Sequence, residues 1–194
     1  IPEIVRVNFK ARTGNETVYN MPTHCPACGS EVVEDESGIV VRCENLECPA
    51  QIFRSILHFV SKDAMDIDGL GTAILEQLIE AKLVRSPADL YVLEREKVEA
   101  LDRMGKQSTD NLLKAIEASK ENDLSRLIHA FGIRQVGAKA AKVLARSFGT
   151  LDALMEATEE TLTAVPDIGG ITAANIRQWF GNEQSRDMIE RLRK

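Results

Sequence analysis

The four cysteines of the chain are the residues whose type and spacing best indicate a chemical role. They follow the pattern Cys-x2-Cys-x14-Cys-x4-Cys, at Cys25, Cys28, Cys43 and Cys48. Two residues between the first two thiols let both sulfurs reach one metal ion. Four thiolates fill the tetrahedral shell of zinc and leave no position for a reactive water. The pattern therefore predicts a structural zinc site with these four ligands, which would contribute to the folding of a small module.

Two disulfides or an iron–sulfur cluster are the alternative uses of four clustered cysteines. The segment Ile1–Lys10 lacks the basic start and apolar block of a secretory leader. We therefore expect a cytoplasmic protein with reduced thiols, which favours zinc over disulfides. His24 adjoins the cluster, but four thiolates leave no need for it as a ligand. The chain also opens without Met, in what looks like mid-strand, which suggests a fragment of a longer protein.

Short extended segments are expected to position the cysteines. Residues 4–9 alternate well enough for a strand, followed by a turn at 13–15 and a second extended segment over 17–20. Between the cysteine pairs, residues 31–41 predict a hairpin whose strands are Val32–Val33 and Ile39–Val41.

An internal repeat dominates the chain after residue 50. Four glycines recur every 32 to 34 residues: Gly71, Gly105, Gly137 and Gly169. Apolar residues lie four and one positions before each glycine and seven positions after it, with mostly small residues three and four positions after. This period predicts a short turn that enters a helix with its inner face at positions +3, +4 and +7. Ser86, Thr150 and Thr158 are expected to cap further helices.

The predicted fold class is mainly α, with tandem helix-hairpin-helix repeats preceded by a small four-cysteine zinc finger and a short β segment. We expect a β segment over residues 1–20, a zinc module over 21–50 and a helical domain with four hairpins over 51–194.

Each predicted turn opens onto a helix N-terminus, where free amides and the helix dipole favour an anion. A turn of this kind needs glycine where the backbone takes positive φ or where it approaches a ligand. A DNA phosphate is the expected occupant, contacted without reading the base sequence. Only the first repeat carries a second glycine two positions earlier, and Arg103, Gln135 and Asp167 stand there in the others, which weakens the expectation. The predicted DNA contacts at the turns are Gly69, Gly71, Gly105, Lys106, Arg134, Gly137, Gly169 and Gly170.

Charge separates the repeats. Positions +2, +5 and +9 of each second helix share one face, and in the third repeat they are Lys139, Lys142 and Arg146. The first repeat has Ala73, Glu76 and Glu80 there. A basic face can be merely solvated. Its place beside a hairpin, in a stretch from Leu124 to Leu151 without any acid, favours DNA contact instead. We expect the third hairpin to bind DNA most strongly and the first to be largely architectural.

Other polar residues carry weaker signals. Asp66 and Asp68 resemble a metal-binding pair, but solvated turn residues or helix caps are the expected roles. His58 and His129 fall on helical segments with no partner visible in the sequence, and no role is predicted for them.

The overall charge of −6 argues against a protein that coats DNA through bulk positive charge. It is compatible with binding through backbone amides and one local basic face. No apolar run approaches the roughly 20 residues that span a bilayer, so no membrane contact is expected. We expect a monomer.

The sequence resembles the bacterial NAD-dependent DNA ligases along essentially its whole length. The resemblance rests on the segments 25–29, 42–51, 58–61, 64–71, 132–137, 148–151 and 165–169. It implies that residues 1–20 end an oligonucleotide-binding barrel and that the hairpins grip nicked double-stranded DNA along the minor groove. It also implies a parent enzyme that joins a 5′-phosphate to a 3′-hydroxyl with NAD and magnesium.

The chain lacks the Lys-x-Asp-Gly motif of that reaction, because Asp68-Gly69 follows Met65-Asp66-Ile67. We therefore expect no catalytic residue here and no NAD or magnesium bound by this part. Two alternatives remain: a hairpin module from another DNA-processing protein, against which the cysteines argue, and a helical scaffold that touches no DNA, against which the basic face argues.

Overall fold

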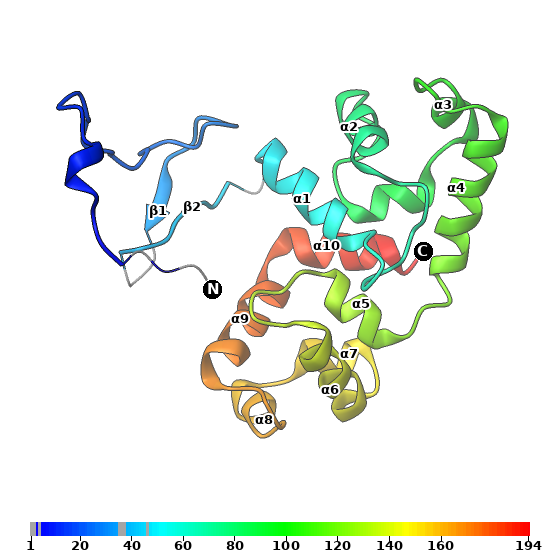
Figure 1. Cartoon of the computed structure of the whole chain (residues 1–194). Coiled ribbons are helices and arrows are strands. Elements are labelled where there is room, and N and C mark those ends of the chain that lie inside the picture. Colours follow the sequence, from blue (N-terminus) through cyan, green and yellow to red (C-terminus); the bar gives the residue numbers. More distant parts are fainter. Residues whose placement is uncertain (1–2, 4, 35–37, 46) are drawn as a thin grey trace. The chain divides into compact units, whose positions relative to one another are not determined.

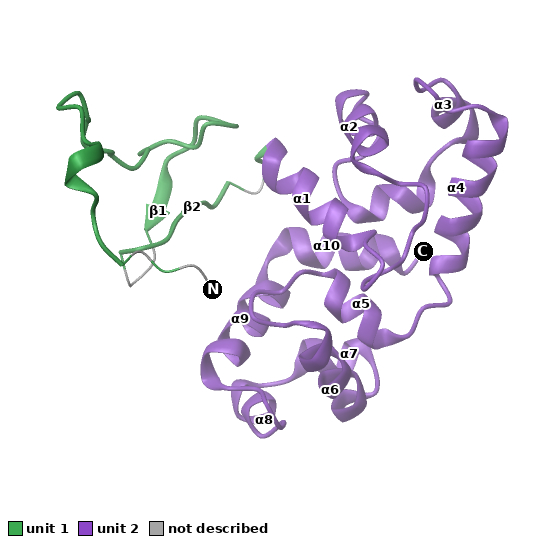
Figure 2. Cartoon of the chain, viewed as in Figure 1, with its two compact units in different colours: residues 1–48 green, residues 49–194 purple. Residues whose placement is uncertain are grey.

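The computed structural model describes residues 3, 5–34, 38–45 and 47–194. The chain divides into two compact units, Ile1–Cys48 and Pro49–Lys194 (Figure 2). Each unit is described by itself below.

Unit 1 contains the 3-10 helix η1 (Phe9–Ala11) and the strands β1 (Val32–Glu34) and β2 (Val41–Cys43) (Figure 1). The strands pair antiparallel, with Val32 opposite Cys43 and Glu34 opposite Val41. This confirms the predicted hairpin, but its second strand begins at Val41 rather than Ile39. In this register Cys43 lies at the end of the β1–β2 ladder, close to Cys28 of the first cysteine pair. Residues 35–37 of the predicted turn lie outside the described residues.

The strand predicted over residues 4–9 is wrong for the residues that the structure describes. Residues 5–8 belong to no strand, Phe9 begins η1, and Ile4 lies outside the described part. Residues 17–20 also belong to no strand. Alternation cannot make a strand without a partner for its backbone groups. The turn at 13–15 is present: the amides of Thr13 and Gly14 donate to the Glu16 carboxylate at 2.5 and 3.0 Å, and Gly14 has φ +83°.

Unit 2 is helical throughout, which confirms the predicted fold class (Figure 1). Its elements in chain order are α1 (Pro49–Phe59), α2 (Thr72–Glu80), η2 (Pro87–Val92), α3 (Arg95–Glu99), α4 (Lys106–Ser119), α5 (Leu124–Ala130), α6 (Ala138–Phe148), α7 (Leu151–Glu156), α8 (Glu159–Thr163), α9 (Gly170–Gly181) and α10 (Glu183–Leu192).

Two apolar cores lie in unit 2, and each gathers two of the four repeats. The first core includes Leu78 and Leu112, which stand seven positions after Gly71 and Gly105. The second includes Leu144 and Ile176, at the same position of the third and fourth repeats. The residues at +4, namely Leu75, Thr109, Ala141 and Ala173, are all fully buried. The +3 residues are half-buried except Ser108, which is exposed. The predicted inner face is therefore confirmed at positions +4 and +7 of every repeat, and it is wrong at +3 of the second repeat.

Side-chain caps begin several of the connecting helices, as predicted. Thr150 and Thr158 accept from the amides of Ala153 and Thr161 at the starts of α7 and α8. Ser86 is the N-cap residue of η2, which is a 3-10 helix. Burial alone would raise the pKa of Asp89, but Arg191 of α10 and the amides of Arg85 and Ser86 outweigh it and lower that pKa. The last helix is thereby tied to the first half of unit 2.

Candidate metal centre and nucleic-acid interface

The four cysteine sulfurs of unit 1 converge on one point. Their Sγ atoms all lie within 4.8 Å of one another, with 3.9 Å between Cys25 and Cys48 and 3.5 Å between Cys28 and Cys43. Sulfurs around a tetrahedral zinc ion at about 2.3 Å stand roughly 3.8 Å apart. All four are free thiols, and a disulfide needs about 2.05 Å. The donor set therefore fits a single zinc ion and does not support the disulfide alternative.

A tight turn brings the first pair of thiols together. The amide of Gly29 donates to the carbonyl of Cys25, and the amide of Cys25 donates to the carbonyl of Ser30, both at 2.8 Å. Gly29 has φ +73°, a conformation that glycine adopts without strain. On the other side, the amide of Cys48 donates to the carbonyl of Asn45 at 3.0 Å. Local backbone bonds thus position ligands from both ends of the hairpin.

The thiols differ in acidity. The Ser30 hydroxyl and the Ser30 backbone lower the pKa of Cys28 to about 6. The backbone of Asn45 favours the thiolate of Cys43, but burial and the neighbouring thiols outweigh it and raise the pKa of Cys43 to about 12. Metal binding displaces the protons of cysteine ligands, so a zinc ion here would be held by thiolates.

In unit 2, each repeat glycine is the N-cap residue of a helix: Gly71 of α2, Gly105 of α4, Gly137 of α6 and Gly169 of α9. Their φ angles lie between −75° and −85° with ψ from 170° to 177°, which any residue can adopt. The expectation that positive φ would explain these glycines is therefore wrong.

Positive φ instead occurs two residues earlier in each turn, at a position called here the tip residue. The tip residues are Gly69 (φ +86°), Arg103 (+61°), Gln135 (+64°) and Asp167 (+66°). The three that replace glycine take the same left-handed conformation, at some cost in strain. The departures from the glycine pattern therefore leave the turn geometry unchanged and alter only the side chain beside each helix N-terminus.

The space around the repeat glycines is open. A Cβ added at Gly71, Gly105, Gly137 or Gly169 would meet no atom within 4 Å. Neither backbone conformation nor packing within the chain requires glycine there. Glycine is among the favoured N-cap residues, it allows close approach by an outside ligand, and it offers no side chain that would compete for the first-turn amides.

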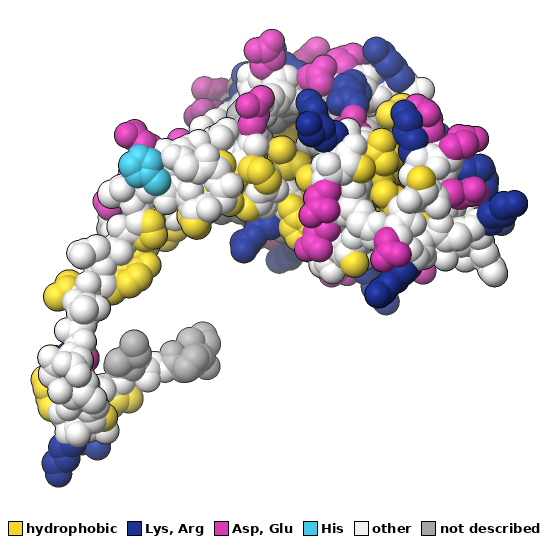
Figure 3. All heavy atoms as spheres, turned by 90° about the horizontal axis from the view of Figure 1, so that it is seen from above, with side chains coloured by type: hydrophobic (Ala, Val, Ile, Leu, Met, Phe, Trp, Pro, Cys, Tyr) yellow, Lys and Arg dark blue, Asp and Glu magenta, His cyan; other side chains and the backbone are white. Residues whose placement is uncertain are grey.

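The predicted DNA contacts are all exposed in the structure. Lys139, Lys142 and Arg146 lie on the exposed side of α6, and Arg134 lies in the turn that precedes it. Lys139 Nζ also forms an ion pair with Asp167 Oδ2 of the fourth turn at 3.2 Å. On the face of unit 2 that Figure 3 shows, acidic and basic side chains are interspersed and form no continuous basic field.

Contacts between turns join the four hairpins in two pairs. In the first pair, the Gln77 side chain of α2 bonds to the backbone of Asp102 in the second turn, at 2.7 Å to the amide and 3.3 Å to the carbonyl. In the second pair, Thr172 Oγ1 of α9 donates to Gln135 Oε1 of the third turn at 3.3 Å. The second link and the Lys139–Asp167 ion pair hold the third and fourth turns side by side.

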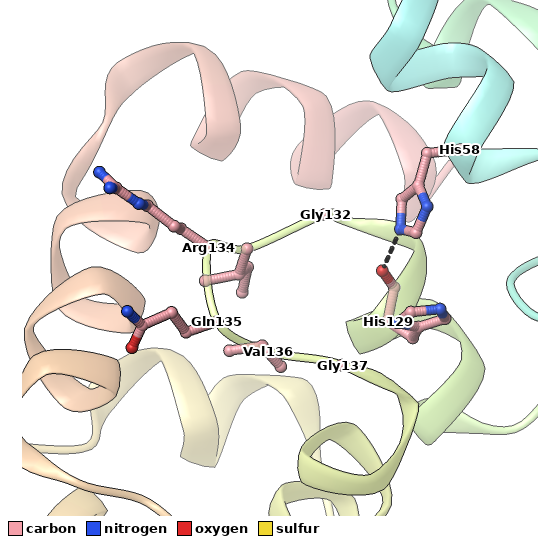
Figure 4. Close-up of a pocket in the computed structure, with 8 residues that line it drawn as sticks. His58, His129, Gly132, Arg134, Gln135, Val136 and Gly137 are labelled. Carbon is pink, nitrogen blue, oxygen red and sulfur yellow. Dashed lines mark hydrogen bonds between the residues drawn. The ribbon is translucent and has the colours of Figure 1, made fainter. Parts of the chain in front are cut away.

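Two histidines that the sequence left without partners meet beside the third turn. The rings of His58 and His129 are 4.9 Å apart and nearly perpendicular, and the His58 ring bonds through Nε2 to the His129 carbonyl at 2.8 Å. Both line a hollow of about 350 Å³ with residues 132–137. Figure 4 shows Arg134 and Gln135 pointing away from the histidines. Burial, and secondarily the charge of His58, lowers the pKa of His129.

Gly132 explains why this packing is possible. Its φ is +64°, and a Cβ there would lie 3.3 Å from His58 Cδ2. The end of α1 therefore supports the third turn directly. The histidines act as packing groups, and their contact could not be found from the sequence because the residues are far apart along the chain.

Arg103 is a candidate contact that the sequence reasoning did not include. It is the tip residue of the second turn, its side chain is 91% exposed, and it stands near Lys106 at the start of α4. The sequence signal for this residue was its place two residues before Gly105.

The two aspartates considered as a metal-binding pair have other partners: Asp68 accepts a hydrogen bond from the amide of Gly69, and Asp66 lies 3.8 Å from Arg126. Among the described residues, the cysteines are the only cluster suited to a metal.

Three family models match the chain. The NAD-dependent DNA ligase C4 zinc finger domain matches residues 24–50. The SAM-like helix-hairpin-helix tandem matches residues 61–118, which hold the first pair of hairpins, and the helix-hairpin-helix motif matches residues 126–189, which hold the second.

Curated relatives named DNA ligase match the whole chain. The protein from Anoxybacillus flavithermus is 51% identical over 193 residues, and that from Acetivibrio thermocellus is 48% identical over 195. In both cases the match covers 100% of this chain and 29% of the relative, so the chain spans less than a third of their length.

Fold and site together define a zinc-finger protein with tandem helix-hairpin-helix motifs. Along its whole length the chain is similar to bacterial proteins named DNA ligase, and its matches to the NAD-dependent ligase zinc finger and to the helix-hairpin-helix models are consistent with a fragment of an NAD-dependent ligase that carries these parts. The matches support assignment to the DNA-binding part of a ligase. In the part of the chain that the structure describes, no helix combines the length and apolar character needed to cross a membrane.

Proposed function

We propose that this chain holds nicked double-stranded DNA for a ligase that joins a 5′-phosphate to a 3′-hydroxyl, using NAD as adenylate donor and magnesium. NAD and magnesium would bind in other parts of the parent enzyme, because the Lys-x-Asp-Gly motif of adenylation is missing here. On this proposal, the fragment contributes binding and positioning but no catalytic residue. It would act as a monomer in the bacterial cytoplasm.

The hairpin turns would contact the phosphate backbone without reading bases. The single observation that carries this proposal is the exposed glycine N-cap of α6, which stands in open space at the start of a helix whose exposed side also carries the cations Lys142 and Arg146. Amides at a helix N-terminus and nearby cations are the two features that bind phosphate. Gly71, Gly105 and Gly169 would act in the same way, with Gly69, Lys106 and Gly170 beside them. Arg134 and Lys139 would add charge at the third turn.

The four cysteines would bind zinc, which would hold unit 1 together without taking part in the reaction. We also propose that residues 1–20 complete an oligonucleotide-binding barrel that lies before residue 21. The exposed apolar side chains of unit 1, including Val5, Phe9 and Val18, support this, because they suit burial against further strands.

The test compares two double variants by fluorescence anisotropy on nicked and intact duplex over a range of salt. K142Q/R146Q removes two exposed cations from α6, the helix that follows the third turn, and we expect the affinity of this variant for DNA to fall about tenfold or more. The slope of log K against log salt should become shallower by about 2, because two phosphate contacts are lost.

The matched control is K97Q/K120Q, which removes the same charge from α3 and the end of α4. Lys97 and Lys120 are tied to Glu94 and Glu117, at 2.7 and 2.6 Å. The control should bind nearly as well as the parent chain. Equal affinity of both double variants would favour the helical scaffold that touches no DNA.

A further inference from the structure

The four turns share one backbone geometry but carry different tip residues. Glycine, arginine, glutamine and aspartate occupy the same left-handed position in order along the chain. Each stands two residues before a glycine N-cap, next to amides that favour an anion. A carboxylate at the fourth tip is unexpected for a phosphate contact, because it brings a negative charge to the place where phosphate would lie.

The carboxylate of Asp167 is engaged with the neighbouring turn. Its Oδ2 atom lies 3.2 Å from Lys139 Nζ, which stands two residues after the glycine N-cap of α6. The two side chains are 59% and 86% exposed, so solvent and DNA can reach both. An exposed ion pair of this kind is weak and easily broken. Lys139 thus has an internal partner, whereas Lys142 and Arg146 are exposed cations for which no such pair is found among the described residues.

We propose that Asp167 weakens the grip of the third and fourth hairpins on DNA, as an internal competitor for the cation that would otherwise bind phosphate. In the free protein its carboxylate holds Lys139. When the duplex arrives, Lys139 must leave this partner, and the carboxylate then faces the phosphate backbone. Asp167 is therefore an affinity-setting residue. This inference rests on the proposed DNA-binding function and adds a residue that opposes it.

The test uses the 194-residue chain with labelled nicked duplex. D167N removes the charge and keeps a residue that tolerates the left-handed conformation. We expect binding about two- to fivefold tighter, the size of an exposed ion pair expressed as affinity. The salt slope should become steeper by about one, because the parent chain offsets the phosphate counterion that it releases with a cation taken up by the freed carboxylate of Asp167, and D167N does not.

The matched control is D187N, which removes one acid from an exposed pair with Arg191 on α10. It should change affinity much less than D167N, since it lies away from the turns in the chain. A second comparison examines Lys139: K139Q should weaken binding more in the D167N background than in the parent chain. This coupling is not expected from a general change in net charge.

Equal affinities of D167N and D187N, or weaker binding by D167N, would overturn the inference. The proposed function fails separately, through K142Q/R146Q. If that double variant binds less well while D167N gains nothing, the hairpins bind DNA and only the role of Asp167 is wrong. If neither variant changes binding, the hairpin surface itself is wrong.

Discussion

Unit 1 and unit 2 are held together in different ways. Among the described residues of unit 1, only Cys25 and Cys48 are buried hydrophobics, and several large apolar side chains are exposed. Unit 2 contains two apolar cores built by a fourfold repeat. A module without an apolar core needs another source of folding free energy, and four converging thiols can supply it through a metal. The spacing of a few metal ligands therefore stabilises unit 1, whereas periodic apolar residues stabilise unit 2.

The largest effect expected from this difference follows removal of zinc. Chelation, or Cys43→Ser, should unfold the β1–β2 hairpin, because structural zinc contributes about 10–16 kcal/mol in small fingers. Unit 2 should keep its helices. Hydrogen exchange read residue by residue would check both statements in one experiment. Protected amides in the hairpin after chelation, or loss of protection across unit 2, would contradict the separate stabilisation of the two units.

A cavity in a core of unit 2 should have the next largest effect. Leu144 is completely buried in the second core. Leu144→Ala should lower the free energy of unfolding of unit 2 by about 2–5 kcal/mol, since it leaves a cavity among packed side chains. Denaturation followed by fluorescence of Trp179, the single tryptophan of the chain, reports on this core.

Val92→Ala is the control for this cavity, because Val92 is 70% exposed. It should cost less than about 0.5 kcal/mol. Similar losses of unfolding free energy in both variants would contradict the role assigned to the second core. A denaturation midpoint of the Trp179 signal that depends on zinc would contradict the independent stability of unit 2.

The smallest expected effect is a loss of stability of unit 2 when the pH is lowered. The pKa of His129 is lowered in the folded state by burial and by His58. Below the ordinary value of about 6.5, the unfolded chain takes up the proton first. Stability from this residue is therefore present above that pH and is lost as the pH falls.

Denaturation midpoints of the parent chain and of H129Q, measured by Trp179 fluorescence near pH 7 and near pH 5, test the acid prediction. The parent chain should lose more stability over this interval than the variant. An equal loss in both would mean that other groups account for the acid sensitivity.

Local patterns predicted much of this structure, and contacts between distant residues account for most of what they missed. The repeat located the buried +4 and +7 residues, and the cysteine spacing located a cluster that fits one ion. The left-handed conformation of Arg103 and Asp167 could not be predicted from the sequence, because the turn imposes a positive φ that these residue types rarely adopt. The contacts of His58 with His129 and of Lys139 with Asp167 depend on the packing of segments that lie far apart in the sequence, so no local pattern predicts them. The strand predicted near residue 4 failed because alternation supplies no partner.

We propose that the exposed glycine N-caps of the hairpins contact phosphate, most strongly at the third turn. Gly137→Ala tests it most directly, because a Cβ there meets nothing within 4 Å and the backbone angles suit alanine. Folding should change by less than about 1 kcal/mol. Affinity for nicked duplex should fall severalfold, and by more than in Gly71→Ala, the equivalent change beside the acidic face of the first repeat. A Gly137→Ala chain that folds and binds like its parent, or loses no more affinity than Gly71→Ala, would contradict the claim.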